Sequence, residues 1–413
     1  MNSIQTRVAK GGVLVLGGGF AGSYVARELG SSGATIVNPA NFMLYTPLLP
    51  EAAAGSVEPR HVTVPLRTMA PHSELLLGKA VALDPDRRVV EVASEAGRFN
   101  VSYADLVLAL GAVTRMPALA GLREHSLGLK DLADAIAVRN HVLRQLDLAD
   151  ASPESARRRL TFVFAGAGFA GVEVLAELHE LVADALQAHP RLAHVEPRWV
   201  LIEGAGRILK QMPERLGHYA RKTLAARGIE VLTDTRLASV DARGATLSDG
   251  RRIETETLVW TAGVTPNPLL GELGLPLDGQ GRVRVDETLR VVGARHIWAL
   301  GDGAAVPNQA TPGETDPATC QHALRQAKRL ARNLRGAPRP YRYRTRGQIA
   351  TLGTRHGVAL LGRLPVNGVL GWHIARAYHL LQLPFASRRL RVLGDWTTAA
   401  IFRRDVAELS SLK

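Results

Sequence analysis

The chain of 413 residues has one cysteine, no apolar run long enough to cross a membrane and no recognisable leader segment. The single thiol, Cys320, excludes an intramolecular disulfide framework and suits a reducing compartment. No apolar stretch reaches the ~20 residues of a spanning helix, and residues 1–10 lack the apolar region of a signal peptide. Because 46% of the residues are hydrophobic, the composition is that of a globular protein. We therefore expect a cytoplasmic protein of two or three domains.

Acidic residues are scarce in the last quarter of the chain. Residues 320–413 carry 18 basic and 3 acidic side chains, whereas residues 1–319 carry 33 basic and 35 acidic ones. The net charge of +13 is therefore confined to one end of the chain. A local excess of this sign suits nucleic acid or an anionic membrane surface.

Two glycine-rich turns each follow an apolar strand pattern and precede a helical one. The first turn is GGGFAG at 17–22, after a predicted strand over 12–16, and the second is GAGFAG at 166–171, after a predicted strand over 160–165. Glycines at these spacings give a tight turn, a close approach of the backbone to a pyrophosphate and close helix packing. The residues expected to contact a dinucleotide here are Gly17, Gly19, Phe20, Ala21, Gly22, Gly166, Gly168 and Gly171. Two copies in the same context indicate an internal duplication.

The pattern around the turns predicts an α/β fold with two Rossmann-like dinucleotide-binding domains and a C-terminal amphipathic helical region. Further buried strands are expected over 34–37, 106–110, 199–202, 258–260 and 297–300, and helices over 20–29, 172–186 and 321–334. The predicted domains are 1–120 with 285–345, an inserted domain over 121–284, and a C-terminal region over 346–413. Polar residues 151–159 are expected to form a linker.

The residue that ends the second strand of each unit differs between the copies. Glu203 can accept hydrogen bonds from both ribose hydroxyls of a coenzyme and would repel a 2′-phosphate, which favours NADH over NADPH. Arg207 follows closely and softens that exclusion. Asn38 occupies the matching place in the first unit and offers an uncharged acceptor.

These features resemble the two-dinucleotide flavoprotein superfamily and, within it, the type II NADH dehydrogenases, which are non-proton-pumping NADH:quinone oxidoreductases. The resemblance covers nearly the whole chain. It is carried by NFMLYTPLLPEAAAG at 41–55, GVE at 171–173, TAGV at 261–264 and CQHALRQ at 320–326. In the last motif Cys320 stands where the family has Ala, and Arg325 where it has a second Gln.

The resemblance implies FAD on the first unit and NADH on the second. It places Asp302 on the ribityl chain of FAD, and it assigns further cofactor contacts to Pro47, Val81, Ala109, Gly111, Gly301, Ala262 and Gly263. Glu173 matches a glutamate near the flavin–nicotinamide contact, with positioning and proton relay as its expected roles. Gln321 and His322 are expected to donate hydrogen bonds to the quinone head group. No metal site is expected.

One cysteine separates this chain from relatives that need two. Disulfide reductases and sulfide:quinone oxidoreductases of the superfamily use thiol pairs, so both activities are excluded. A soluble NAD(P)H diaphorase, a ferredoxin-type reductase and a flavin-bound docking or sensing protein remain as alternatives.

Apolar, aromatic and arginine residues alternate over 368–413. This composition is typical of an amphipathic segment that lies on an anionic membrane, where a quinone is dissolved. We expect a peripheral protein on the cytoplasmic face of the cell membrane. The alternatives are packing on the protein's own body, packing on a second copy in a homodimer, and nucleic-acid binding through the alternating Tyr341, Arg342, Tyr343 and Arg344. No nucleic-acid module is recognisable, so nucleic acid is not expected as a partner.

Overall fold

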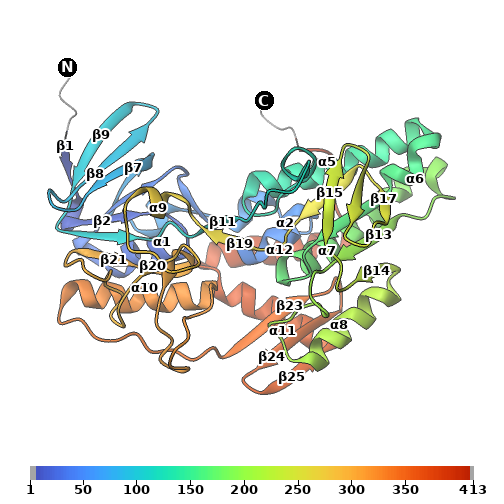
Figure 1. Cartoon of the computed structure of the whole chain (residues 1–413). Helices are drawn as coiled ribbons and strands as arrows, with labels where there is room; N and C mark the ends of the chain where they lie inside the picture. The colour runs from blue at the N-terminus through green and yellow to red at the C-terminus, as the bar shows by residue number, and fades with distance from the viewer. Residues whose placement is uncertain (1–5, 410–413) are drawn as a thin grey trace. The chain divides into compact units, whose positions relative to one another are not determined.

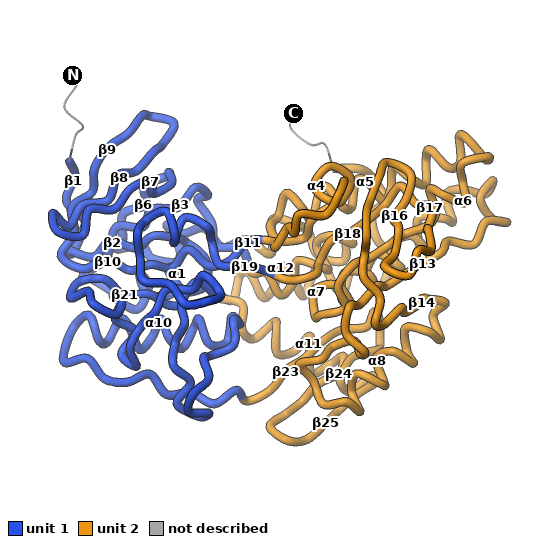
Figure 2. Tube along the Cα trace, in the orientation of Figure 1, with its two compact units in different colours: residues 1–44, 63–113, 264–345 blue, residues 45–62, 114–263, 346–413 orange. Residues whose placement is uncertain are grey.

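The computed structural model describes residues 6–409 and divides the chain into two compact units, shown in Figure 2. Unit 1 comprises residues 1–44, 63–113 and 264–345, and unit 2 comprises residues 45–62, 114–263 and 346–413. Residues 1–5 and 410–413, which fall in the predicted first domain and C-terminal region, lie outside the described residues.

Unit 1 is built on a five-stranded parallel sheet with the order β21-β10-β2-β3-β6. These strands are Ile297–Ala299, Asp105–Leu108, Val13–Leu16, Thr35–Asn38 and Glu74–Leu77. Helices α1 (Phe20–Glu28) and α10 (Cys320–Arg335) pack against each other (Figure 1). All four residues of β2 are buried, as an apolar run inside a parallel sheet requires.

Smaller elements complete unit 1. A mixed sheet has the order β1-β9-β8-β7, with bounds Thr6–Val8, Gly97–Ser102, Val89–Ser94 and Lys79–Asp84. Two-stranded ladders pair β4 (Phe42–Leu44) with β5 (Thr63–Pro65), β20 (Val283–Arg284) with β22 (Ala304–Ala305), and β11 (Ala112–Thr114) with β19 (Val264–Pro266). The short helices of unit 1 include η1 (Lys10–Gly12), η2 (Gly30–Ser32), α3 (Leu66–Met69), α9 (Leu269–Glu272) and η8 (Gly301–Gly303).

Unit 2 repeats the parallel design with a four-stranded sheet in the order β14-β13-β12-β18. The strands are Ile229–Leu232, Arg198–Ile202, Thr161–Ala165 and Thr257–Trp260. The helices packed in this unit include α2 (Leu49–Ala53), α4 (Leu122–His125), α5 (Leu132–Ala151), α7 (Phe169–Ala185) and α8 (Glu214–Ala226). An antiparallel sheet of β15 (Leu237–Asp241), β16 (Gly244–Leu247) and β17 (Arg252–Glu254) lies in sequence between β14 and β18 of the parallel sheet.

The C-terminal region contains more than helices. It begins with an antiparallel sheet of β23 (Gly347–Thr351), β24 (Gly357–Leu361) and β25 (Leu364–Asn367), and continues into α11 (Gly368–Gln382) and α12 (Ala386–Phe402) (Figure 1). None of the helices formed by residues 6–409 is long and apolar enough to cross a membrane.

The unit boundaries differ from the predicted domain boundaries at several places. Residues 264–284 belong to unit 1, because β20 within them pairs with β22 of that unit. Residues 45–62 and 346–413 belong to unit 2, where α2 packs on α7 and β23 packs on α7. The predicted linker over 151–159 is instead mostly helical, with η5 (Pro153–Ser155) followed by α6 (Ala156–Arg159). Ser155 and Ala156 are buried there, so this segment is part of the body of unit 2.

Candidate functional site

The first glycine-rich turn is held by contacts that only glycine allows. Gly17 has φ +106°, and a Cβ on it would collide with the carbonyl oxygen of Ala109. A Cβ on Gly22 would collide with the carbonyl oxygen of Gly17. Tight packing of α1 against β2 therefore depends on these two glycines.

Gly19 has a different surrounding. It is the N-cap of α1 with φ −72°, a conformation open to alanine, and no atom lies within 4 Å of the position a Cβ would take. Protein packing therefore leaves this glycine unexplained, whereas close approach of a phosphate to the helix N-terminus explains it. The cradle fits the pyrophosphate of a dinucleotide.

The second turn repeats each of these features. Gly166 has φ +107°, and a Cβ on it would meet the backbone of Ala262; a Cβ on Gly171 would collide with the carbonyl oxygen of Gly166. Gly168 is the N-cap of α7 with φ −75° and has open space around its Cβ position. The predicted duplication thus extends to the individual contacts of the loop.

Asn38 and Glu203 perform the same structural task in the two units. Asn38 Oδ1 accepts a hydrogen bond of 2.8 Å from the backbone N–H of Gly18. Glu203 Oε2 accepts one of 2.8 Å from the N–H of Ala167, and its Oε1 accepts one of 2.9 Å from the N–H of Ala205. In each unit, the residue at the strand end accepts a hydrogen bond from the second residue of the glycine turn and so holds the turn in place. Each oxygen retains a lone pair that can accept a further bond.

Arg207 is engaged with its own loop. Its guanidinium donates to the backbone oxygens of Met212 and Lys210, at 2.9 Å and 2.7 Å. The exposed Arg236 side chain instead lies beside Gly204, next to Glu203, with its Nε 3.1 Å from the position of a Cβ on that glycine. Sequence reasoning missed Arg236, because it lies on a separate loop.

The turn after β21 is secured by a polar network in unit 1. The N–H of Gly301 donates to Gln326 Oε1 at 2.8 Å, and Gln326 Nε2 donates to Asp316 Oδ2 at 3.0 Å. Gln326 and Asp316 are buried. This network positions the loop that carries Asp302, which is half-buried. Gln326 follows directly after the motif position that Arg325 occupies, and sequence reasoning did not single it out.

The structure places His322, which was predicted to donate a hydrogen bond to the quinone head group, inside unit 1. Its side chain is 2% exposed, and its Nδ1 lies 3.1 Å from Asp316 Oδ2 and 3.2 Å from the Tyr341 hydroxyl. Its Nε2 lies 3.0 Å from Thr345 Oγ1. Both ring nitrogens are therefore engaged inside unit 1. Burial of Tyr341 also removes the alternating exposed Tyr–Arg surface considered for nucleic acid.

Gln321 and Cys320 begin the same helix. Gln321 is half-buried, and its Oε1 accepts a hydrogen bond of 3.4 Å from the Tyr343 hydroxyl. Burial, and secondarily the nearby Asp302 charge, raise the pKa of the Cys320 thiol to about 11. A thiol with this pKa is not a reactive thiolate.

The other predicted cofactor contacts are spread over both units. Ala109 and Gly111 follow β10, the neighbour of β2, so they lie at the carboxyl edge of the unit 1 sheet with Gly17 and Gly301. Val81 lies on β7 and is 37% exposed. Pro47 lies in η3 (Thr46–Leu48) of unit 2. Ala262 and Gly263 follow β18 at the carboxyl edge of the unit 2 sheet.

Glu173 is buried at the start of α7. Its Oε1 accepts a 3.0 Å hydrogen bond from the N–H of Thr351 in β23. Burial raises its pKa to about 8, and the charges of Glu51 and Glu177 act in the same direction. A carboxyl group with this pKa can hold a proton at neutral pH and release it, as a proton relay must.

Glu173 belongs to a group of four carboxyls, three of them buried and Glu180 half-buried, here called the carboxyl cluster. Three of them, Glu173, Glu177 and Glu180, lie on one face of α7, and Glu51 comes from α2. Glu51 is 5% exposed, and burial raises its pKa to about 7. Sequence reasoning assigned a role only to Glu173: Glu51 lies within the motif at 41–55 without a role of its own, and Glu177 and Glu180 belong to no motif.

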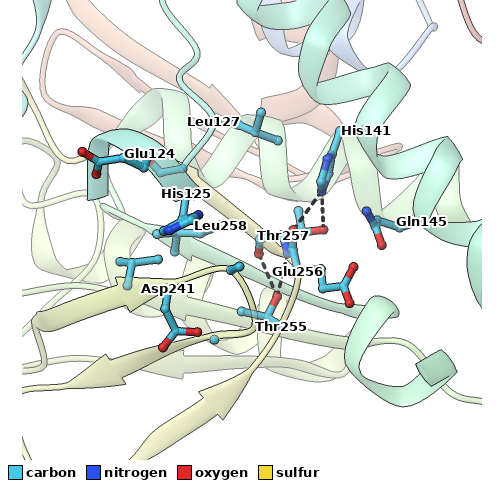
Figure 3. A pocket seen from close by; sticks show the side chains of 14 residues that line it. Glu124, His125, Leu127, His141, Gln145, Asp241, Thr255, Glu256, Thr257 and Leu258 are labelled. Atoms are coloured by element: carbon cyan, nitrogen blue, oxygen red, sulfur yellow. Dashed lines mark hydrogen bonds between the residues drawn. The ribbon is translucent and has the colours of Figure 1, made fainter. Parts of the chain in front are cut away.

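A separate cavity of about 310 Å³ lies at the opposite edge of the unit 2 sheet, between α4, α5 and the β15–β17 sheet (Figure 3). Its lining includes His125, His141, Asp241 and residues 255–258 at the start of β18. The glycine turn and Glu203 follow the other ends of these parallel strands. The cavity is therefore not the dinucleotide cradle. Within residues 6–409 no group of three or more His, Cys, Asp or Glu side chains is arranged to hold a metal ion.

Comparison with known proteins agrees with this arrangement. The family model described as pyridine nucleotide-disulphide oxidoreductase matches residues 11–327. The type II NADH:quinone oxidoreductase NdhA of Mycobacterium tuberculosis is 30% identical over 405 residues, which cover 93% of this chain and 86% of that protein. The demethylphylloquinone reductase NdbB of Synechocystis is 30% identical over 406 residues, covering 94% of this chain and 95% of that protein.

The fold is also that of a solved relative. The structure of NDH2 from Plasmodium falciparum in complex with NADH superposes with a TM-score of 0.89 at 17% identity, covering 98% of this chain and 100% of that one. Membership of one family therefore explains both glycine turns, the residues that fix them and the match along nearly the whole chain. The chain belongs to the pyridine nucleotide-disulphide oxidoreductases and, within them, to the type II NADH:quinone oxidoreductases.

Proposed function

We propose that this protein is an FAD-dependent NADH:quinone oxidoreductase that does not pump protons. The observation that carries the proposal is the pair of matching cradles, in which Gly19 and Gly168 leave open space at two helix N-termini. One dinucleotide-binding unit serves FAD and the other serves NADH. Of the relatives named above, NdhA is a type II NADH:quinone oxidoreductase and NdbB is a demethylphylloquinone reductase.

In unit 1 the turn at 17–22 binds the pyrophosphate of FAD, and Asp302 accepts hydrogen bonds from its ribityl chain. When bound, FAD supplies the two-electron chemistry that accepts a hydride from NADH and delivers electrons to a quinone. Gln326 fixes the loop that orients Asp302, since it holds the N–H of Gly301. Gln321, at the start of α10, is assigned to the quinone head group as a hydrogen-bond donor.

In unit 2 the turn at 166–171 binds the pyrophosphate of NADH. Glu203 accepts hydrogen bonds from the ribose hydroxyls while it fixes the turn through Ala167. Its negative charge disfavours NADPH. Glu173 holds a proton close to the start of α7. The reaction consumes NADH, quinone and one proton. A group that takes a proton from water and passes it to the quinone is therefore needed.

An anaerobic titration tests this function directly. Addition of NADH to the purified holoprotein is expected to bleach the flavin absorbance, and addition of a quinone is expected to restore it. A panel that also includes iron–sulfur carriers and soluble dyes separates a quinone reductase from a diaphorase or ferredoxin-type reductase. Bleaching with no reoxidation by any acceptor would favour a docking or sensing protein and contradict the proposal.

The C-terminal helices supply a surface for an anionic membrane at its cytoplasmic face. Their exposed large apolar side chains are Val369, Leu370, Leu381, Leu390, Leu393, Ile401 and Phe402. Arg391 is exposed on α12, and Arg388 and Arg389 lie beside it. Leucines and arginines that share a surface suit the boundary between acyl chains and anionic head groups.

Sedimentation with liposomes tests this surface. Each of Leu381→Ser, Leu390→Ser and Ile401→Ser is expected to weaken binding to anionic vesicles about tenfold or more, since burying such a side chain contributes ~1.5–3 kcal/mol. Leu148→Ser on α5 is the matched control, because Leu148 is also partly exposed. Equal binding by all variants would exclude the membrane role. A variant that changes oligomeric state instead of vesicle binding would identify a homodimer surface.

A further inference from the structure

The C-terminal segment of unit 2 reaches into the carboxyl cluster at two points. Trp396 on α12 donates from its indole Nε1 to Glu51 Oε2 at 3.0 Å. Arg404, just after α12, donates to Glu177 Oε2 at 3.0 Å and to Glu180 Oε2 at 2.7 Å. The Arg404 side chain is 7% exposed, so this ion pair is shielded from solvent.

Hydrogen bonds and an ion pair with α5 hold the C-terminal segment in place outside the cluster. Arg139 of α5 donates to the backbone oxygens of Asp405 and Ala407, and Arg144 pairs with Glu408. Asn140 and Leu409 exchange two hydrogen bonds. These contacts fix the chain immediately after Arg404, which places the guanidinium between its two carboxylates.

The four carboxyls are unequally neutralised. Glu180 pairs with Arg227 as well as Arg404, and Glu177 pairs with Arg404 and accepts from the Ser56 hydroxyl. In the described part of the chain, the one ion pair of Glu51 is with Arg376, whose Nε lies 3.9 Å from Glu51 Oε1. None of the ion pairs found among residues 6–409 includes Glu173, which accepts a hydrogen bond from the N–H of Thr351.

Arg376 is itself held by the C-terminal helices. Its guanidinium lies 4.3 Å from the ring centre of Trp372 and 4.5 Å from that of Trp396. The indoles therefore keep this cation beside Glu51 without a close hydrogen bond between the two charged groups.

Other charged groups packed around the cluster complete its surroundings. Asp184 on α7 faces Arg404, His179 lies 3.4 Å from Arg227, and Thr354 donates to Glu180 from the β23–β24 turn. Four carboxyls thus share three arginines, and the imbalance favours retention of a proton on the least neutralised members.

We propose that Arg404 is a positioning residue whose charge, held against Glu177 and Glu180, limits how tightly the carboxyl cluster holds the proton that the reaction consumes. This inference rests on the proposed function. The proton leaves a carboxyl O–H and enters an O–H bond of the quinol, while the two electrons and the other hydrogen come from NADH. The carboxylate then regains a proton from water, so the cluster is unchanged after each turnover.

The variants Arg404→Gln and Arg404→Lys test the proposal. Loss of the cation is expected to make the cluster bind protons more tightly and to move the alkaline limb of the quinone-dependent pH profile upward by about one unit. Lysine at 404 restores a positive charge and is expected to return the limb to the wild-type position. Arg144→Gln removes an ion pair that holds the same C-terminal segment but lies outside the cluster. The pH profile of its quinone reductase activity is expected to match that of the wild type.

Infrared titration of the holoprotein gives a second readout that needs no quinone. The band of protonated buried carboxyls is expected to persist to higher pH in Arg404→Gln than in the wild type. Trp396→Phe removes only the N–H donor to Glu51 and is expected to shift the band in the same direction, which keeps the test available if Arg404→Gln does not fold.

An unshifted titration in both variants would overturn the proposal. Equal losses of quinone reductase activity in Arg404→Gln, Arg404→Lys and Arg144→Gln, with no shift of the alkaline limb of the pH profile, would also overturn the proposal. The C-terminal segment would then have a structural role alone. Failure of quinone reduction in the wild type would refute the proposed function alone, because the infrared titration would still report the cluster.

Discussion

At the scale of single residues, the glycines of each turn divide into two classes. Gly22 and Gly171 are required by the protein itself, because a side chain would strike the backbone of the turn. Gly19 and Gly168 have room for a methyl group and an ordinary φ. Their presence is explained by a ligand that approaches the backbone.

This division predicts opposite phenotypes for two alanine variants of unit 2. Gly168→Ala is expected to leave the melting temperature within about 2 °C of wild type, since exposed substitutions without clashes change stability by less than ~0.5 kcal/mol. It is expected to raise KM for NADH about tenfold or more. Gly171→Ala is expected to lower the melting temperature markedly. Thermal denaturation and steady-state kinetics of both variants test this, and equal stability of the two would contradict it.

Glu203 is expected to set coenzyme choice through its charge. Glu203→Gln keeps an acceptor for the N–H of Ala167 but removes the repulsion of a 2′-phosphate, and Arg236 is close enough to attract one. We expect kcat/KM for NADPH to rise relative to NADH by about tenfold or more. Arg207→Gln is the control, since Arg207 is engaged with its own loop. A similar change in Arg207→Gln would contradict this assignment.

At the scale of elements, α10 acts as a support for the loop at 301–303. Residues of this helix hold that loop through Gln326 and order residues 341–345 through His322. In the motif at 320–326, His322 and Gln326 therefore stabilise the protein itself, whereas Gln321 is the residue proposed to contact the quinone.

Gln326→Leu is expected to weaken retention of FAD. The change leaves the N–H of Gly301 without its acceptor and removes one donor from the Asp316 carboxylate, which keeps His322 as a partner, at a cost of about 1–3 kcal/mol. Flavin released on dilution, measured by fluorescence, is expected to rise several-fold. Gln348→Leu in β23 of unit 2 serves as a control remote in sequence from the loop. Unchanged retention in Gln326→Leu would show that the network does not stabilise the cofactor site.

At the scale of the whole molecule, the carboxyl cluster links stability to pH. The pKa values of Glu51 and Glu173 rise from 4.5 to about 7 and about 8 on folding. The folded state therefore binds these protons more tightly than the unfolded chain does. This contribution is complete below pH 4.5 and is lost as pH rises towards about 8.

Glu173→Gln is expected to remove part of the loss of folding stability that the wild type shows as pH rises. Near pH 5 the variant and the wild type should melt at similar temperatures, because the wild-type carboxyl is protonated and resembles an amide. As pH rises to 9 the variant should become the more stable of the two. Glu95→Gln changes an exposed carboxyl and should show no such trend. Thermal melts across this range decide the matter, and a constant difference between Glu173→Gln and wild type would refute it.

The sequence by itself determined the two dinucleotide-binding units, because their signals are local. Apolar strands, glycines at fixed spacing and the strand-end residues Asn38 and Glu203 all lie within short segments, and backbone sterics act over the same range. The duplication and the resemblance to type II NADH dehydrogenases follow from these segments.

Tertiary structure alone decided which side chains meet across the chain. Glu51 and Trp396 are 345 positions apart, and no periodicity relates them. Likewise, an exposed or buried position for His322 depends on Tyr341 and Asp316 folding back over α10. The physical reason is that the proton affinity of a carboxyl or an imidazole depends on burial and on nearby charges, and both exist only after distant segments have packed.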